Sequence, residues 1–194
     1  MKKILKIGLD SAAPVPMHTD FNSEVFEGFE VDLMKEISLL LDLELRYEIS
    51  VWKNILEKLY KGELDMICSA VTMTPSRQHI LEFSMPYLQF RLCAVVRQGT
   101  SMHQFQSFDQ KVIGVRMATE AEKYIMEKFP SHQIVHANRN EELYQLLIAG
   151  EIDVVIDDSP IAGGFLQKYK QLQLGMFMPG THSQYAIAMR KGDH

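Results

Sequence analysis

Polar residues follow an apolar segment in each half of the chain. In the first half, residues 64–70 are followed by Thr72 and Arg77, and in the second half residues 152–156 are followed by Asp158. The Arg77 guanidinium can bind a carboxylate with two parallel hydrogen bonds, and the Asp158 carboxylate can bind an ammonium group. A buried zwitterion requires both, because an unpaired buried charge is very costly. The chemistry predicted for these residues is noncovalent binding of a free amino acid.

Each of these residues also has a structural interpretation. An isolated arginine is more often an exposed surface residue, and Asp158-Ser159-Pro160 also matches the start of a helix. Ser69 and Thr72 can add hydroxyl or backbone donors for a carboxylate. Taken singly, the residues leave both interpretations open.

Strand and helix patterns alternate in both halves of the chain. In the first half they predict a strand over 4–9, a helix over 31–41, a strand over 43–49, a helix around 55–59 that stops at Gly62, and a strand over 64–70. In the second half they predict strands over 112–115, 133–135 and 152–156 and helices over 120–129 and 141–149. This alternation predicts an α/β fold.

The two halves share a local phrase. Residues 62–67 read Gly-Glu-Leu-Asp-Met-Ile and residues 150–155 read Gly-Glu-Ile-Asp-Val-Val, each after a predicted helix and at the start of a predicted strand. Ligands of open α/β sheets bind beyond the carboxyl ends of the strands. Two such sheets facing each other would form a cleft lined by the polar residues, although one six-residue echo is also compatible with chance.

Composition excludes several classes of function. The chain has 194 residues, a formal net charge of −5 and no cluster of lysine or arginine, which argues against a nucleic-acid partner. No apolar run approaches the roughly 18 residues of a membrane helix, and no intact signal peptide is recognisable. The length fits one large domain or two small lobes. Cys68 and Cys93 lie inside apolar runs, so we expect buried thiols rather than a disulfide.

Several phrases, in order, resemble one family. They are Gly28–Leu33 (G-F-[DE]-[VI]-D-L), Asp65–Arg77 (D-x6-T-x-T-x-x-R), Phe83–Tyr87 (F-S-x-P-Y), Val112–Thr119 and Asp153–Asp158. They are similar to the amino-acid-binding proteins of ABC importers, the bacterial extracellular solute-binding proteins of family 3, which have the type II periplasmic-binding-protein fold. The resemblance covers almost the full length of the chain.

The resemblance implies a two-lobed architecture. Each lobe is a mostly parallel sheet flanked by helices, and two hinge strands, expected around 89–94 and 184–187, join the lobes. Residues 1–90 would form lobe 1, residues 91–184 lobe 2, and residues 185–194 would return to lobe 1. Members of the family normally continue further, so the C-terminal part of lobe 1 is expected to be missing here.

The resemblance also implies roles for individual residues. The residue matching Arg77 holds the α-carboxylate of the ligand, and the residue matching Thr72 donates to it. The residue matching Asp158 binds the α-ammonium, Trp52 matches an aromatic that packs on the ligand side chain, and Asp10 matches an acid at the distal end of the ligand.

The second lobe departs from the family pattern at its anion contact. Thr119 matches a small hydroxyl residue whose amide faces the carboxylate at a helix N-terminus. Ala118 replaces the usual glycine, and Glu120 follows where small residues are common. The expected ligand-binding set is completed by Ser69, Ala70 and Arg116; no catalytic residue, metal or other cofactor is expected.

Charge near the expected cleft gives a hypothesis for the ligand side chain. Asp10, Asp157 and Glu120 outnumber Arg116, which favours a polar or basic amino acid such as glutamine, arginine or lysine. If Glu120 only stabilises its own helix and Asp157 points away, Asp10 is the single acid near the ligand side chain, and it would fit an amide as readily as a cation. If Arg116 points inward, the favoured ligand would instead be glutamate. The expected partner is the membrane permease of an ABC importer, with the protein a monomer in the periplasm or outside the cell.

Two other functions remain compatible with the sequence. Dehydratases similar to cyclohexadienyl dehydratase use the same scaffold, and Glu120 is the acid that could protonate a leaving hydroxyl. The chain could also be the ligand-sensing domain of a larger receptor or cell-wall enzyme. No histidine lies in the phrases that resemble the family's cleft, which argues against catalysis.

Overall fold

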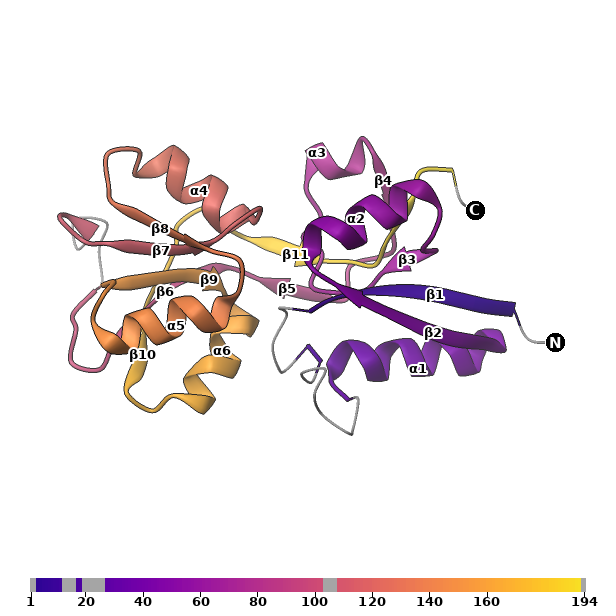
Figure 1. The fold of residues 1–194 in the computed structure, drawn as a ribbon, viewed down its shortest axis with the longest axis horizontal. Helices are drawn as coiled ribbons and strands as arrows, with labels where there is room; N and C mark the ends of the chain where they lie inside the picture. The colour runs from indigo at the N-terminus through magenta and orange to yellow at the C-terminus, as the bar shows by residue number, and fades with distance from the viewer. Residues whose placement is uncertain (1–2, 12–16, 19–26, 103–107, 193–194) are drawn as a thin grey trace. The chain divides into compact units, whose positions relative to one another are not determined.

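The chain divides into two compact units in a computed structural model that describes residues 3–11, 17–18, 27–102 and 108–192 (Figure 1). Unit 1 comprises Met1–Gln89 and Ser183–His194, and unit 2 comprises Phe90–His182. Each unit contains a five-stranded sheet with helices packed on it, which confirms the predicted α/β class. Within the described ranges, no helix combines the length and the apolar composition that a membrane crossing needs.

The sheet of unit 1 has the strand order β2-β1-β3-β12-β4. Its strands are β1 (Lys3–Asp10), β2 (Leu43–Ser50), β3 (Met66–Ile67), β4 (Leu81–Phe83) and β12 (Ala188–Arg190), and its helices are α1 (Phe29–Leu41), α2 (Trp52–Lys61) and α3 (Pro75–Gln78). β1 runs parallel to β2 and β3, whereas β12 is antiparallel to β3 and β4. The carboxyl ends of β1, β2 and β3 therefore meet at one edge of the sheet.

Apolar side chains cover both faces of this sheet. Ile55 and Leu59 of α2 pack with Ile67 in one buried cluster, and Met34 of α1 packs with Ile7 in another. Figure 1 shows α1 and α2 on opposite sides of β1 and β2. The apolar residues at helical spacing in both helices thus fix their faces against the sheet.

The sheet of unit 2 has the strand order β10-β6-β9-β7-β8. Its strands are β6 (Leu92–Arg97), β7 (Ile113–Arg116), β8 (Ile134–Ala137), β9 (Val154–Asp158) and β10 (Leu172–Phe177), and its helices are α4 (Glu120–Lys128), α5 (Asn140–Ala149) and α6 (Ser159–Lys168). β7 runs parallel to β8 and β9, and β6 is antiparallel to β9 and β10. The carboxyl ends of β7, β8 and β9 again share one edge.

Two short strands lie where the chain passes from one unit to the other. β5 (Leu88–Phe90) and β11 (Ser183–Tyr185) pair in a separate two-stranded sheet. The unit boundaries fall after Gln89 and after His182, within or beside these strands. That these strands act as hinges stays a prediction.

The repeated sequence phrase has the same structure in both units. Its glycine ends the preceding helix in the left-handed conformation, as predicted. In unit 1, Asp65 donates its backbone N–H to the carbonyl of Lys6 and accepts the Lys6 N–H on Oδ2. In unit 2, Asp153 makes the same pair of bonds with Val112. The echo therefore marks equivalent helix-to-strand connections.

In each unit, a glycine of the first parallel strand lies against the third residue of the repeated phrase, Leu64 or Ile152. A Cβ on Gly8 would lie 2.8 Å from Cδ1 of Leu64, and a Cβ on Gly114 would lie 2.6 Å from Cδ1 of Ile152. Real Cβ atoms essentially never come that close, so a side chain at either glycine would require this leucine or isoleucine to move.

One predicted strand is much shorter than expected. The sequence predicts a strand over 64–70, but β3 comprises only Met66–Ile67. Extended structure cannot continue to Ala70, because this residue has φ 50 in the left-handed region. The predicted strand over 152–156 is shifted as well, since β9 comprises Val154–Asp158.

The two cysteines are free thiols in the cores of the units. Cys68 lies in unit 1 and Cys93 in unit 2, and both are buried. Burial raises the pKa of both thiols above the ordinary value. The prediction that they are core residues is confirmed.

Candidate functional site

The expected carboxylate-binding residues of unit 1 follow β3 in a loop that bonds to β1 and to β11. Ser69 is buried, and its Oγ accepts a hydrogen bond from the backbone N–H of Asp10 at 2.9 Å. Thr72 forms an isolated antiparallel bridge with Tyr185, the last residue of β11, which precedes β12 in the chain. The loop is therefore anchored at both ends, at the edge of the sheet where parallel strands end.

Arg77 is brought to this loop by the short helix α3. Thr74 caps that helix, since its Oγ1 accepts from the Arg77 N–H at 3.3 Å, and Pro75 provides a proline at its start. The Arg77 Nη1 donates to the carbonyl oxygen of Thr72 at 2.9 Å, and its Cζ lies 5.4 Å from the centre of the Trp52 ring. The structure thus brings together Trp52, Thr72 and Arg77.

Asp10 and Trp52 lie at the ends of adjacent parallel strands. Asp10 is the last residue of β1, pairs with Ser50 of β2 and is 2% exposed. Trp52 begins α2 two residues after β2 ends, and it is partly buried against the cluster under that helix. Asp10, Trp52, Ser69 and the Thr72–Arg77 pair therefore share one edge of unit 1.

The expected anion contact of unit 2 is a capped helix start. Thr119 is the N-cap of α4: its Oγ1 accepts from the Glu122 N–H at 3.2 Å and donates to the Arg116 carbonyl at 2.7 Å. Ala118 is left-handed, with φ 60, and donates its N–H to Glu122 Oε2 at 2.8 Å. The Arg116 Nε donates to the Asn138 carbonyl at 3.2 Å. Arg116 and Thr119 are thus held together after β7.

Two adjacent acids at the end of β9 have different environments. Asp157 is buried, and its carboxylate accepts from Asn140 Nδ2 at 2.8 Å, from the Tyr144 hydroxyl at 3.1 Å and from the Asp158 N–H at 2.8 Å. Burial raises the pKa of Asp157 to about 6 in spite of these bonds. The Asp157 carboxylate therefore bonds with the interior of unit 2, in agreement with the alternative in which Asp157 points away from the ligand.

Asp158 is placed differently, although it precedes a helix. It is half-buried at the carboxyl end of β9, and α6 starts at the next residue with Pro160 in its first turn. The Asp158 side chain makes no capping hydrogen bond to that helix. Since β7 and β9 are neighbouring parallel strands, Arg116 and Asp158 both lie at the carboxyl edge of unit 2.

Glu120, the acid considered for catalysis, is a half-buried residue at the first position of α4. A carboxylate there favours the helix N-terminus electrostatically, which accounts for an acid at this position without catalysis. In the part of the chain that the structure describes, no group of three or more potential ligand side chains could hold a metal ion.

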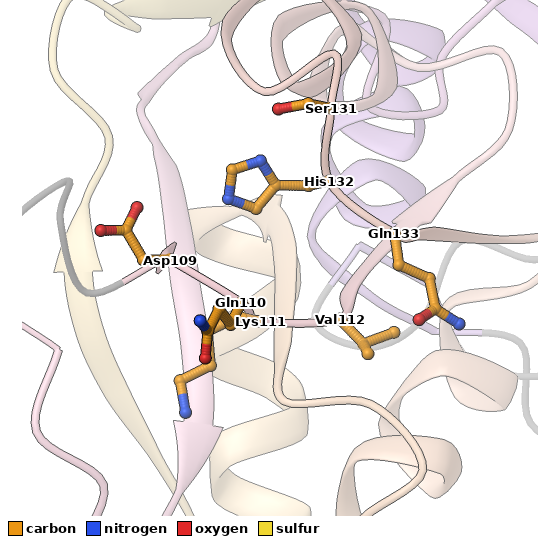
Figure 2. A pocket seen from close by; sticks show the side chains of 7 residues that line it. All are labelled: Asp109, Gln110, Lys111, Val112, Ser131, His132 and Gln133. Carbon is orange, nitrogen blue, oxygen red and sulfur yellow. The ribbon is translucent and has the colours of Figure 1, made fainter.

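A surface pocket of about 560 Å³ lies at the opposite end of the unit 2 sheet. Figure 2 shows its lining side chains, which come from the segments before β7 and β8: Asp109, Gln110, Lys111, Val112, Ser131, His132 and Gln133. None of them belongs to the predicted set. Because ligands of open α/β sheets bind at the carboxyl ends of the strands, the pocket is not the candidate site.

Comparison with protein families gives a match over nearly the whole chain. The family described as bacterial extracellular solute-binding proteins, family 3, matches residues 5–193. The amino-acid-binding protein AabA of Dichelobacter nodosus is 29% identical over 171 residues, covering 86% of this chain and 68% of that protein. The ABC transporter glutamine-binding protein GlnH of Bacillus subtilis is 26% identical over 176 residues, covering 88% of this chain and 64% of that protein. The chain thus spans about two thirds of the length of these relatives.

Solved structures show the same fold. The arginine-bound form of truncated ArgBP from T. maritima superimposes with a TM-score of 0.87 at 28% identity, covering 98% of this chain and 89% of that chain. The ancestral amino acid-binding protein AncCDT-1, described as a precursor of cyclohexadienyl dehydratase, has a TM-score of 0.87 at 26% identity, covering 98% of this chain and 82% of that chain. The predicted type II periplasmic-binding-protein architecture is confirmed.

Proposed function

The chain belongs to the bacterial extracellular solute-binding proteins of family 3, and from this premise we propose that it binds one free amino acid and delivers it to an ABC importer. The curated relatives named above are binding proteins, in agreement with the prediction that the chain is not an enzyme. On this proposal the protein works outside the cytoplasmic membrane, in the periplasm or the extracellular space, and its partners are the amino acid and the membrane permease.

The contact between Arg77, Thr72 and Trp52 is the observation that carries the proposal. A guanidinium oriented by a backbone carbonyl and an aromatic ring presents a fixed cation, as binding a carboxylate in a buried site requires. In our proposal Arg77 binds the ligand α-carboxylate, and Ser69 and Thr72 provide additional donors. The Ala70 N–H already donates to Glu30, so Ala70 contributes through the shape of the loop.

The ammonium group is assigned to unit 2. Asp158 lies at the carboxyl edge of the sheet, and its side chain does not cap α6. The preceding acid, Asp157, hydrogen-bonds inside the core of unit 2. The helix start at Thr119, with Arg116 beside it, is proposed as the second anion contact. Because these residues and Arg77 belong to different units, the proposal treats the units as lobes that close on one ligand.

For the ligand side chain we propose a polar or basic amino acid, such as glutamine, arginine or lysine. With Asp157 committed to the interior of its unit and Glu120 at a helix start, Asp10 is the acid that remains for the distal end of the ligand. Glutamine, the ligand that gives GlnH its name, and arginine, which is bound in the ArgBP structure, both fall in this class.

The dehydratase alternative has one observation in its favour, the similarity to a precursor of cyclohexadienyl dehydratase. That similarity is to a protein described as amino acid-binding, and Glu120 has an adequate structural role. Native mass spectrometry of gently purified protein tests the choice. A bound amino acid of unit stoichiometry, recovered unchanged after incubation, supports the binding function; conversion of a hydroxylated cyclohexadienyl substrate would support the enzyme.

A further inference from the structure

Glu30 is a fully buried acid in the first turn of α1 that bonds to the loop carrying the proposed carboxylate contacts. Its Oε1 accepts a hydrogen bond from the backbone N–H of Ala70 at 2.6 Å and another from the Tyr87 hydroxyl. Glu30 and Tyr87 belong to the phrases G-F-E-V-D-L and F-S-M-P-Y, to which the proposed function gives no role. Their side chains meet next to Ala70, which lies inside the phrase Asp65–Arg77.

The backbone of Ala70 needs such a contact. Ala70 is a non-glycine residue in the left-handed region, with φ 50, where Cβ comes too close to a backbone oxygen. Strained conformations of this kind persist when surrounding contacts hold them, and they occur preferentially at functional sites. The hydrogen bond from Ala70 to Glu30 is a contact of this kind, and it lies two residues before Thr72.

We propose that Glu30 is a positioning residue for ligand binding: by holding the Ala70 N–H, it fixes the left-handed turn that orients Ser69 and Thr72 toward the ligand carboxylate. The inference rests on the proposed function, because it assigns these loop residues to the ligand. Glu30 itself does not touch the ligand in this account.

Unit 2 contains a parallel arrangement. Ala118 is also left-handed, with φ 60, and its N–H is held by the carboxylate of Glu122 directly before Thr119. His136 in turn contacts that carboxylate, with 2.7 Å between Nδ1 and Oε1. In both units a glutamate therefore holds a strained alanine at the proposed ligand contact.

The environment of Glu30 makes its contact sensitive to pH. Burial raises the pKa of Glu30 to about 7, with Asp10 adding to the rise and the bonds from Tyr87 and Ala70 opposing it. Glu30 in turn contributes to the raised pKa of the buried Cys68 thiol. A neutral carboxyl accepts hydrogen bonds more weakly than a carboxylate. The hydrogen bond from the Ala70 N–H to Glu30 therefore weakens as the pH falls below about 7.

The contact can be tested without any ligand by NMR of the ¹⁵N-labelled chain. In the wild type, the Ala70 amide proton shift is expected to follow a titration with a midpoint of about 7, and this titration should be absent in Glu30→Gln. Amide exchange of Ala70 should be at least about tenfold faster in Glu30→Ala and largely restored in Glu30→Gln, which keeps a neutral acceptor. Unchanged exchange in Glu30→Ala would overturn the proposal.

The effect on binding is then measured by calorimetry at pH 8 with L-arginine and L-glutamine. Glu30→Ala should bind about tenfold more weakly than wild type, whereas Glu30→Gln should stay within about threefold. Glycine adopts positive φ without strain, so Ala70→Gly added to Glu30→Ala should recover part of the loss. The matched control is Asp65→Asn, which alters a carboxylate bond to the Lys6 N–H elsewhere in unit 1 and should leave affinity unchanged.

The outcomes separate this proposal from the proposed function. Faster Ala70 exchange with unchanged affinity in Glu30→Ala would overturn the positioning role while leaving amino-acid binding intact. An equal loss in Glu30→Gln and Glu30→Ala, with no recovery by Ala70→Gly, would also overturn it. A wild type that binds none of the twenty amino acids would overturn the proposed function, and with it the positioning role, even if the Ala70 amide titrates as expected.

Discussion

The guanidinium of Arg77 donates a hydrogen bond to the carbonyl oxygen of Thr72 at 2.9 Å. The two lie five positions apart in the sequence, and the short helix α3, which contains Arg77, turns the side chain back onto the loop. The carbonyl orients one edge of the guanidinium, and the guanidinium carbon lies over the Trp52 ring. This pairing gives the proposed carboxylate site a cation whose position is set before the ligand arrives.

Replacing Arg77 by alanine should nearly abolish binding. The ligand carboxylate would be buried without its cation, a loss of roughly 3 to 5 kcal/mol, or at least about a hundredfold in affinity. Calorimetry with the preferred amino acid measures the effect. The exposed Arg46 gives the control, because Arg46→Ala should leave affinity unchanged; an Arg77→Ala affinity within a few fold of wild type would remove Arg77 from the site.

The two acids at the end of β9 should respond differently to amidation. Asp158→Asn removes the proposed partner of the ligand ammonium and should weaken binding by about a hundredfold. Asp157→Asn places an amide where Asn140 and Tyr144 both donate, so it should lower the melting temperature but change affinity by only a few fold. The opposite ranking of affinities would exclude Asp158 as the ammonium site.

Glu30 should make stability fall with rising pH. Burial raises its folded pKa from 4.5 to about 7, so the folded state holds this proton more tightly than the unfolded chain. The resulting stability is fully present below pH 4.5 and is lost between 4.5 and about 7, by about 3 kcal/mol if the unfolded pKa is ordinary.

Urea unfolding of wild type and Glu30→Gln at several pH values tests this linkage. The difference between the two free energies of unfolding should change steadily across that window and level off above it. Asp157→Asn is a second comparison, with an effect expected between 3.8 and about 6. A constant difference between wild type and Glu30→Gln at every pH would show that Glu30 does not titrate differently on folding.

A thermal-shift panel of the twenty amino acids should rank polar or basic ligands first. A ligand at 100 times its dissociation constant stabilises by about 2.7 kcal/mol, which is readily measured. If arginine or lysine leads, Asp10→Asn should weaken it far more than it weakens glutamine, because the lost charge matters most to a cation. Leucine, valine or aspartate in first place would contradict the charge argument, and equal losses would place Asp10 outside the side-chain pocket.

The sequence predicted the features that depend on local patterns. Three such features were predicted: the apolar periodicity of α1 and α2, the ends of two helices at Gly62 and Gly150, and the repeated Gly-Glu-x-Asp phrase. Each depends on residues that are close together in the sequence. The buried state of Cys68 and Cys93 also followed from their apolar neighbours.

Features that depend on distant contacts could not be predicted. The strand predicted over 64–70 ends early because Ala70 turns left-handed, and that turn is held by Glu30, 40 residues earlier in the sequence. Asp157 and Asp158 are adjacent and chemically identical in the sequence. Only the packing of Asn140 and Tyr144 beneath β9 assigns the first to the interior. The sequence shows that two acids stand at this position, but it does not show which of them points into the core.

On the proposed function, a cation and an anion of the protein recognise the ligand as a zwitterion. Calorimetry of the wild type with the leading amino acid of the panel, its carboxamide and its N-acetyl derivative tests this most directly. We expect one site per chain for the free amino acid. Both derivatives should bind at least about a hundredfold more weakly, since each leaves a buried charge of the protein unpaired. Equal affinity for all three compounds, or no binding of any of the twenty amino acids, would contradict it.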